Sequence, residues 1–372
     1  MIIGYDAKRL FTNFTGLGNY SRGLVHHYHH VFADDELYLF TPSINVDQRT
    51  KPFLDNPAYR IIEPKGFKPL WRSHEVVKDI HHADINVYHG LSHELPLGIS
   101  KLDIGKVVTI HDLIFKYYTD DHAWFDRKIY DWKWKHAVMT ADMVIAISEK
   151  TKEDLVHYYN VHPEKIKVIY QSADPVFSKP VNNEMIDNAR KKYNLPAHYN
   201  LYVGSVISRK NLLSIIRAMS LMNDTDKFPL VIIGHGKEYK KKVLKEAEEL
   251  KVSHLLVWLG SPEFEDFPAI YKGAQMMIYP SLHEGFGLPV IEAMHIGIPV
   301  ITSNQSSLKE AGGNAAFLID PEKPDQLVDA IIQISTDTTL RSTMVQNGMD
   351  HIKKFEPGKL VSELRNEYMK LV

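Results

Sequence analysis

The sequence contains no cysteine and no long apolar run, and each absence excludes a class of protein. Among its 372 residues there is no cysteine, which rules out disulfides, thiolate metal sites and cysteine nucleophiles. No segment approaches the roughly 20 apolar residues of a membrane-spanning helix, and the opening MIIGYDAKRLF has no apolar signal-peptide core. We therefore expect a cytoplasmic protein that does not span a membrane.

A strong excess of either charge is also missing. The 44 Lys and Arg residues are balanced by 46 Asp and Glu residues, which leaves a formal charge of −2 and no bulk attraction for nucleic acid or anionic lipid. The 20 histidines are densest in HHYHH, residues 26–30, but no carboxylates accompany them at the spacing of a metal site. We expect a solvated helix face there and no bound metal.

Short apolar runs alternate with segments of helical period along the chain, which is typical of α/β proteins with parallel sheets. Helical periods run through NYSRGLVHHYHHVF in the first half and KEYKKKVLKEAEELK in the second. A chain of this length suits two doubly wound domains. The expected strands are MIIGY, LYLF, INVYHG, KVVTIH, DMVIAIS and IKVIY, followed by NLYVG, PLVIIG, LLVWLG, MMIYP, IPVIT and AAFLI.

A segment without periodicity separates the two halves. Residues 171–185, QSADPVFSKPVNNEM, hold two prolines and several Asn and Asp residues, as linkers do. We expect an N-terminal domain over residues 1–175 and a C-terminal domain over residues 186–356. Residues 357–372 form a helix with an apolar stripe, which must pack on one of the domains. The stripe does not indicate which domain the helix packs on, and packing back on the N-terminal domain is one possible arrangement.

Open parallel sheets bind ligands beyond the carboxyl ends of their strands, so the strand-to-helix turns are the places to examine. After the strand NLYVG, Arg209 and Lys210 come just before a helix that Asn211 is expected to cap. Two cations near the positive end of a helix dipole cost stability unless an anion joins them. This turn therefore suits a diphosphate, and a solvated basic turn is the alternative.

The turn after MMIYP, in PSLHEGFGLPVIEAM, places two glutamates eight residues apart, Glu284 and Glu292. Gly285 and Gly287 allow close approach of the backbone, and Pro289 suits the first turn of a helix. We expect Glu284 at the strand tip and Glu292 in or near the first helical turn, both facing one ligand. Carboxylates accept hydrogen bonds from sugar hydroxyls, so the pair suits a ligand with two sets of vicinal hydroxyls. The alternative is that Glu292 offsets the helix dipole and Glu284 is solvated.

Two turns in the N-terminal half carry weaker signals. TGLGNYSRG places Gly16 and Gly18 before a helix, where the backbone can approach a phosphate or a sugar, although the glycine spacing breaks the G-x-G-x-x-G dinucleotide fingerprint. TIHDLIF places His111 at the end of a strand, where it can bond to a hydroxyl or move a proton. His89 and His93 lie at a neighbouring strand end. A structural role is the alternative for all three histidines.

These motifs together resemble a known family. EGFGLPVIE, preceded by PSLH and followed by AMHIGIPVITSN, together with YVGSVISRKNL, GLGNY and TIHDL, is similar to the retaining family 4 glycosyltransferases of the GT-B fold. The similarity covers nearly the whole chain in the family's order. It implies two Rossmann-like domains of doubly wound parallel sheets that face an interdomain cleft. The acceptor binds on the N-terminal side, and the nucleotide-diphospho-sugar donor binds to the C-terminal domain.

The resemblance also implies roles for the matching residues. Glu284, with the amides of Phe286 and Gly287, matches the group that holds the transferred sugar, and Glu292 matches the group that binds ribose. The other matches are Arg209, Lys210 and the amides around Leu288 on the diphosphate, Gly16 and Gly18 in the loop that closes over it, His111 near the sugar and acceptor, and the segment 260–264 with Pro262 at the base. One departure is Ser205 after Gly204, where many relatives have arginine, so that Arg209 is expected to supply the missing charge.

The activity implied is transfer of a hexose to a hydroxyl of a glycan or a lipid-linked acceptor, with retained configuration. We expect no metal and no cofactor, because cations and helix N-termini stabilise the leaving diphosphate and no D-x-D carboxylate pair is obvious between strands. GDP-mannose is the first guess for the donor, and a UDP-sugar is the alternative. A nucleotide-sugar epimerase or hydrolase and a non-catalytic nucleotide-sugar-binding protein remain open. Peripheral contact with the inner face of the membrane through WKWKH, residues 132–136, is a further option.

Overall fold

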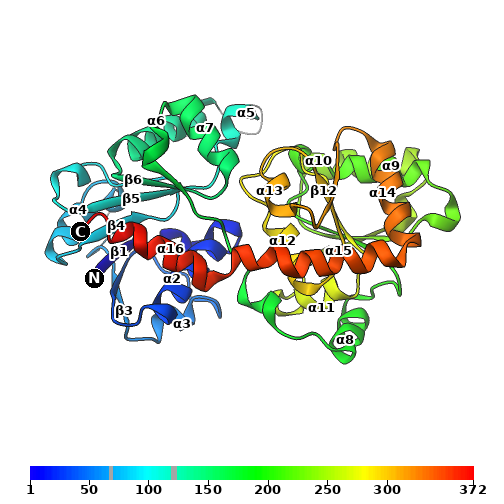
Figure 1. The fold of residues 1–372 in the computed structure, drawn as a ribbon, viewed down its shortest axis with the longest axis horizontal. Coiled ribbons are helices and arrows are strands. Elements are labelled where there is room, and N and C mark those ends of the chain that lie inside the picture. The colour runs from blue at the N-terminus through cyan, green and yellow to red at the C-terminus, as the bar shows by residue number, and fades with distance from the viewer. Residues whose placement is uncertain (67–69, 119–123) are drawn as a thin grey trace. The chain divides into compact units, whose positions relative to one another are not determined.

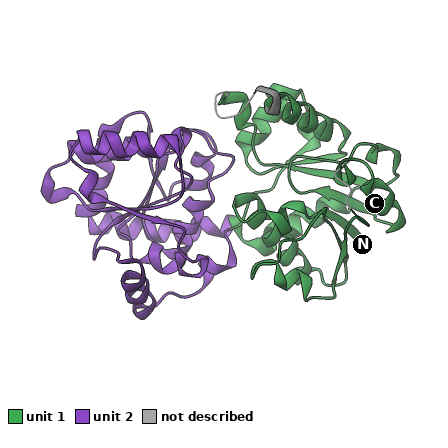
Figure 2. Ribbon diagram, turned by 180° about the vertical axis from the view of Figure 1, so that it is seen from behind, with its two compact units in different colours: residues 1–172, 355–372 green, residues 173–354 purple. Residues whose placement is uncertain are grey.

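The computed structural model describes residues 1–66, 70–118 and 124–372, and for residues 124–126 the backbone only. The chain forms two compact units, which Figure 2 shows in different colours. Unit 1 comprises Met1–Ser172 and Phe355–Val372, and unit 2 comprises Ala173–Lys354. The chain therefore leaves unit 1 once near residue 172 and returns to it for its last helix.

Unit 1 is built on a seven-stranded parallel sheet in the order β3-β2-β1-β4-β5-β6-β7 (Figure 1). The apolar runs predict six of these strands correctly. The edge strand β3 escapes the pattern because it has only four residues and includes the exposed Arg60. The strands are β1 (Ile2–Asp6), β2 (Glu36–Phe40), β3 (Tyr59–Ile62), β4 (Val87–Gly90), β5 (Gly105–Ile110), β6 (Met143–Ala146) and β7 (Ile166–Val168).

Helices cover both faces of this sheet, as the buried strands require. Side chains alternate between the faces, so that Val107 belongs to one core and its neighbour Val108 to the other. The first core includes residues of α2 and α16, and the second includes residues of α4, α6 and α7. The helices of unit 1 are α1 (Lys8–Thr12), α2 (Gly16–Val31), α3 (Lys51–Leu54), α4 (Val76–His82), α5 (Ile114–Tyr117), α6 (Trp124–Thr140), α7 (Glu149–Tyr159) and α16 (Pro357–Tyr368).

The C-terminal helix α16 packs against α2 with Leu360, Val361, Leu364 and Tyr368 buried. A buried carboxylate also holds it in place. Asp35 pairs with the amino group of Met1 at 2.8 Å and with Arg365 of α16 at 2.8 Å, and it accepts a hydrogen bond from Tyr28 at 2.9 Å. Because removal of one partner from a buried pair typically costs about 3–5 kcal/mol, these contacts fasten both ends of the chain to unit 1.

Unit 2 repeats the pattern with six parallel strands in the order β10-β9-β8-β11-β12-β13. The sequence predicts all six. They are β8 (Asn200–Val203), β9 (Leu230–Ile233), β10 (Leu256–Gly260), β11 (Met277–Tyr279), β12 (Val300–Ser303) and β13 (Phe317–Ile319). The main core of this unit lies between the sheet and α9 (Leu212–Leu221), α10 (Glu238–Glu249) and α14 (Pro324–Thr336). The predicted class, two doubly wound parallel sheets, is confirmed.

The remaining helices of unit 2 frame the strand ends. The helix α12 (Leu288–Ile296) follows β11 and packs on β11 and β12. The others are α8 (Asn183–Tyr193), α11 (Phe267–Lys272), α13 (Leu308–Gly312) and α15 (Thr338–His351). Since every strand of each sheet runs in the same direction, the turns after β8, β11 and β12 meet at one edge of unit 2.

Candidate functional site

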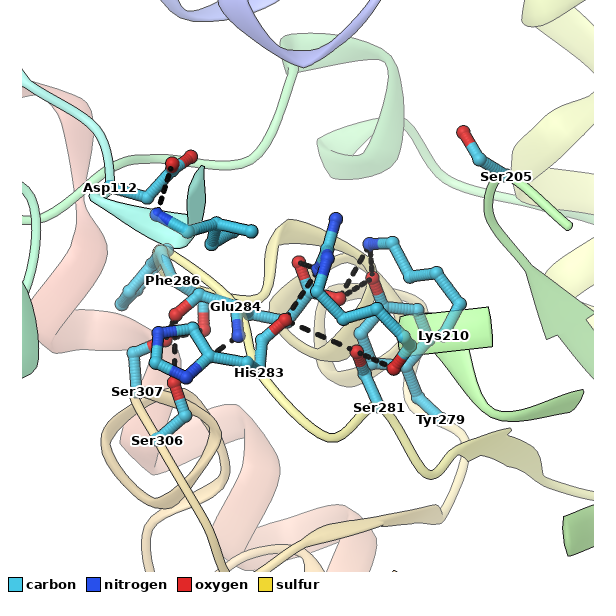
Figure 3. Close-up of polar contacts among 12 residues, drawn as sticks. Asp112, Ser205, Lys210, Tyr279, Ser281, His283, Glu284, Phe286, Ser306 and Ser307 are labelled. Carbon is cyan, nitrogen blue, oxygen red and sulfur yellow. Dashed lines mark hydrogen bonds and ion pairs between the residues drawn. The ribbon is translucent and has the colours of Figure 1, made fainter. Parts of the chain in front are cut away.

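Three of the predicted site residues meet at the carboxyl edge of the unit 2 sheet, and Figure 3 shows two of them, Lys210 and Glu284. Lys210 Nζ lies 2.6 Å from Glu284 Oε1, and Arg209 lies 3.2 Å from Glu284 Oε2. Tyr279 donates a hydrogen bond of 3.1 Å to the same Oε1 and accepts one from Lys210. Both carboxylate oxygens of Glu284 are therefore bound by cations, and its side chain is only 10% exposed.

Backbone contacts bring these groups together. Arg209 and Lys210 lie in a single 3-10 turn, Ser208–Lys210, between β8 and α9. The backbone oxygen of Arg209 accepts hydrogen bonds from the amide of Leu282 at 2.9 Å and the hydroxyl of Ser281 at 3.1 Å. The guanidinium of Arg209 in turn donates to the backbone oxygen of His283. The turn after β8 and the turn after β11 are thus fastened to each other.

Asn211 does not cap α9 in the expected way. It occupies the N-cap position with a left-handed backbone, φ 56°, and its side chain makes no bond to the helix amides. Its side-chain amide donates instead to the backbone oxygens of Pro280 at 3.2 Å and Pro321 at 2.8 Å. The cap prediction was wrong because the side chain binds two strand-end turns that are distant in sequence.

The glycine-rich turn that carries Glu284 is held by two serines from the turn after β12. Ser306 accepts a hydrogen bond from the Glu284 amide and donates to the Glu284 backbone oxygen at 2.8 Å, and the hydroxyl of Ser307 lies 2.7 Å from that oxygen. Ser307 also lies 2.9 Å from the oxygen of Phe286, which is buried. Gly287 has φ +131°, and a Cβ there would come within 2.8 Å of Leu308. The turn therefore needs glycine at this position, and Leu288 begins α12 directly after it.

The surroundings lower the pKa of Glu284 and raise the pKa of Glu292. Burial tends to raise the pKa of Glu284, but Lys210 and Arg209 outweigh it and hold that pKa at about 2. Burial raises the pKa of Glu292 to about 7, and only the hydrogen bond from Tyr271, 2.9 Å long, opposes the rise. Glu292 lies in the second turn of α12, just past the first turn in or near which it was predicted. The two glutamates share no partner in the described residues.

The other residues predicted in unit 2 lie at the same sheet edge but outside this cluster. Gly204 follows β8, and the exposed Ser205 lies apart from Glu284 (Figure 3). Pro262 follows β10 and is half-buried. A D-x-D triplet does occur, at residues 224–226, contrary to the expectation. It precedes β9, at the opposite edge of the sheet, and Asp224 there pairs with Lys227 at 2.8 Å.

In unit 1, Gly16 and Gly18 lie inside the first turn of α2 and not ahead of it. The helix starts earlier than predicted because Asn13 takes over the capping. Its side-chain oxygen accepts hydrogen bonds from the amides of Gly18 at 3.1 Å and Thr15 at 3.0 Å. A Cβ on Gly18 would lie 1.7 Å from the Asn13 backbone oxygen, whereas Gly16 has open space around it. Only Gly18 is therefore required for packing.

His111 follows β5 and is buried with both ring nitrogens engaged. Nε2 lies 2.9 Å from the backbone oxygen of Leu91, and Nδ1 lies 2.9 Å from the side-chain nitrogen of Gln171. Burial lowers its pKa to about 4, so the ring is neutral, with Nε2 donating and Nδ1 accepting. Its ring also meets Tyr20 edge-on at 4.6 Å. These contacts fix the orientation of the imidazole.

The two other histidines separate into different environments. His89 contacts Tyr368 at 2.5 Å and Thr109 at 2.8 Å, and burial lowers its pKa to about 3. It belongs to the core that binds α16. His93 has a left-handed backbone, φ 63°, and its ring stacks on Trp134 at 4.0 Å and lies 5.1 Å from the ring of His111. His89 therefore has the structural role that was the alternative, whereas His93, which is also buried, lies beside His111.

Four side chains of the cluster in unit 2 were missed by the sequence reasoning: Tyr279, Ser281, Ser306 and Ser307. The strand run MMIYP contains the tyrosine and the segment PSLH contains the first serine, so their places at a strand end were visible. Nothing in the sequence indicated that the last two serines of SNQSS, 22 and 23 residues after Glu284, bind its backbone.

Two features are absent from the described residues, a metal site and a membrane-spanning helix. No group of three or more His, Asp or Glu side chains there has the arrangement of a metal site. None of the helices in the described ranges combines the length and the apolar character needed to cross a bilayer.

Comparisons with known proteins agree with this geometry. Residues 185–351 match the model of the glycosyl transferases group 1, and residues 14–177 match that of Glycosyltransferase Family 4. O-antigen chain mannosyltransferase B of Escherichia coli is 28% identical over 95% of this chain and 96% of its own. O-antigen chain mannosyltransferase RfbU of Salmonella typhimurium is 30% identical over 62% of this chain and 60% of its own.

The fold agrees as well. A crystal structure of a glycosyltransferase from Rickettsia africae superimposes with a TM-score of 0.77, at 17% identity, and covers 100% of this chain and 98% of that one. With two Rossmann-like parallel sheets and two family matches that together span most of its length, the chain belongs to the group 1 and family 4 glycosyltransferases of the GT-B fold and is similar to their mannosyltransferases.

Proposed function

We propose that this glycosyltransferase moves mannose from GDP-mannose to a hydroxyl of a glycan or lipid-linked acceptor, with retained anomeric configuration and without a metal ion. The observation that carries the proposal is the convergence of Glu284, Arg209 and Lys210 at one strand-end edge. A ligand that carries both a diphosphate and vicinal hydroxyls can place the diphosphate on the two cations and the hydroxyls on the carboxylate. The names of the relatives, O-antigen mannosyltransferases among them, support mannose as the sugar and cell-surface polysaccharide synthesis as the setting.

In the structure Glu284 pairs with the two cations that the proposal gives to the diphosphate. Both of its oxygens face Arg209 or Lys210. When the diphosphate arrives, it competes for the same cations, and the carboxylate is freed to accept hydrogen bonds from the sugar hydroxyls. The amides at the start of α12, around Leu288, add donors with the positive end of a helix dipole. Glu292 binds the ribose hydroxyls in its charged form.

The chemical step follows from these positions. The bond between the anomeric carbon and the diphosphate oxygen breaks, and Arg209 and Lys210 stabilise the charge that develops on the leaving group. The acceptor hydroxyl attacks from the leaving-group face, and its proton passes to the departing phosphate oxygen. His111 is neutral and does not act as a base, and it orients a hydroxyl by exchanging one of its bonds to Leu91 and Gln171 for a bond to the acceptor. A carboxylate with a pKa of about 2 is a weak base, which argues against Glu284 as a covalent nucleophile.

A panel of GDP-, UDP- and ADP-sugars in a thermal-shift assay tests the donor. Binding raises the melting temperature with ligand concentration, and we expect GDP-mannose to produce the largest shift. Absence of a shift with every nucleotide sugar contradicts the proposal. Product analysis then separates the alternatives. Free mannose identifies a hydrolase, an altered sugar identifies an epimerase, and binding without turnover identifies a non-catalytic protein.

Two further measurements test the mechanism. Proton NMR of the glycoside formed on octyl α-mannoside reports the anomeric configuration, which we expect to be α, as in the donor. Turnover is expected to be the same with EDTA as without it. A β product overturns retention, and loss of turnover in EDTA that magnesium or manganese restores overturns metal independence.

A further inference from the structure

The carboxyl edge of the unit 1 sheet carries an open depression that the proposed donor chemistry does not use. Its empty volume, the open solvent at its mouth included, is about 410 Å³. Asp6 contributes from the end of β1, Arg72 from the 3-10 turn Trp71–Ser73, and Glu94 from the loop after β4. Successive turns of α6 contribute Trp132, Lys133 and His136.

The charged groups in this depression leave one carboxylate oxygen available. Arg72 binds Asp6 at 2.7 Å and Glu94 Oε2 at 2.8 Å, and Lys133 binds the same Glu94 Oε2 at 3.2 Å. Burial tends to raise the pKa of Glu94, but Arg72 and Lys133 outweigh it and lower that pKa. Glu94 is therefore charged at neutral pH. Within the described residues its Oε1 has no hydrogen-bond donor, and the side chain is 22% exposed.

An exposed aromatic ring lies at the rim of the same depression. Trp132 is 56% exposed, and its indole is nearly parallel to the ring of His136, with 6.0 Å between the ring centres. A large indole left in water is costly unless an apolar surface covers it. A pyranose ring can satisfy both groups. Its apolar C–H face can cover the indole, and its hydroxyls can bond to a carboxylate and an ammonium.

We propose that the depression formed by Asp6, Arg72, Glu94, Trp132, Lys133 and His136 binds a neutral sugar unit of the acceptor. The inference rests on the proposed function, since it supplies the acceptor for that reaction. The sugar stacks on Trp132 and donates a hydroxyl hydrogen to Glu94 Oε1. The helix α6 also connects the depression to His111. Its Trp134 stacks on His93, and the ring of His93 lies 5.1 Å from the ring of His111.

Fluorine NMR of the full-length protein with 5-fluorotryptophan tests this directly. The chain has five tryptophans, and Trp132→Phe identifies the signal of Trp132. The probes are methyl α-mannoside, methyl α-glucoside and an α-linked mannobiose. We expect a saturable shift of the Trp132 signal with at least one probe, and a loss of affinity of about fivefold or more in Glu94→Gln, because a charge-assisted hydrogen bond is lost. Glu153→Gln, at an exposed glutamate of unit 1, is the matched control and should bind as the parent does.

The outcomes distinguish this proposal from its competitors. No Trp132 shift with any of the three saccharides, or equal affinity in Glu94→Gln and Glu153→Gln, overturns it. A shift of Trp132 with vesicles of phosphatidylglycerol but not with sugars also overturns it and assigns this face of α6 to a membrane. Donor binding by unit 2 is followed separately by the thermal shift with GDP-mannose. The absence of a thermal shift with GDP-mannose counts against the proposed function, while a saturable shift of the Trp132 signal with a sugar still establishes a saccharide site.

Discussion

The two units share one architecture but differ in how their strand-end groups are satisfied. In unit 1, His111 and His89 are buried, neutral and bonded through both ring nitrogens to neutral partners. In unit 2, Glu284 is buried and charged between two cations. The same sheet edge thus offers neutral hydrogen bonds in one unit and exchangeable ion pairs in the other. We infer that unit 1 suits an uncharged hydroxyl acceptor and unit 2 suits a charged diphosphate.

The largest effect is expected from removing a cation of unit 2. Lys210→Ala takes away the closest partner of Glu284 and a group that we assign to the leaving diphosphate. Loss of one preorganised electrostatic contact costs roughly 10²–10³ in rate, so kcat/KM for mannose transfer should fall by about that factor. Lys241→Ala, at a lysine of unit 2 that is 74% exposed, should leave it unchanged. A Lys210→Ala enzyme within threefold of the parent would contradict the role of this cation.

A matched pair of glycines tests the loop of unit 1. Gly18→Ala places a Cβ in collision with the Asn13 backbone, whereas Gly16→Ala meets open space in the same helical turn. Overpacking costs about 1–3 kcal/mol, so urea unfolding should show that loss for Gly18→Ala. Gly16→Ala should be neutral or slightly stabilising, because alanine favours helix. Equal stability of the two variants would mean that the loop after α1 adapts and is not fixed by Asn13.

The strand-end predictions succeeded where the signal was local and failed where it was not. Apolar runs such as KVVTIH and PLVIIG identify strands because both faces of a parallel sheet are buried, and their ends place His111, Lys210 and Glu284 correctly at sheet edges. The start of α2 was misplaced, because two glycines imply a loop unless Asn13 is known to cap the helix. The pairing of Glu284 with Arg209, 75 positions earlier, depends on how turns meet in space, which periodicity does not encode.

Substitution of His111 in unit 1 should have a smaller effect than substitution of Lys210 in unit 2. His111→Ala should lower kcat by about tenfold, the value of one lost hydrogen bond, and leave the dissociation constant of GDP-mannose unchanged. Because burial holds the pKa of His111 near 4, the parent should show no loss of kcat between pH 8 and pH 5 that is due to this ring. A pH–rate profile of parent and variant checks both points. A step near pH 6.5 that vanishes in the variant would show that the ring titrates and acts as a base.

The smallest effect concerns Glu292, whose pKa is raised to about 7 mainly by burial. The charged form binds ribose hydroxyls more strongly than the neutral form, so GDP-mannose affinity should rise about fivefold from pH 6 to pH 8. The free energy of unfolding should change in the opposite direction and fall as the pH rises. The raised pKa stabilises the folded protein below the ordinary glutamate pKa of about 4.5, and this contribution is lost as the pH rises to about 7. Both slopes should flatten in Glu292→Gln, and slopes that persist there must come from another group.

The most direct test of the shared site is calorimetric binding of GDP and GDP-mannose to Glu284→Gln. If the carboxylate competes with the diphosphate for Arg209 and Lys210, the variant should bind GDP as tightly as the parent or more tightly. It should also lose the extra affinity for GDP-mannose over GDP, together with transfer. A variant that binds GDP about tenfold more weakly than the parent, or that transfers mannose at the parent rate, would contradict the claim that Glu284 exchanges these cations for the sugar hydroxyls.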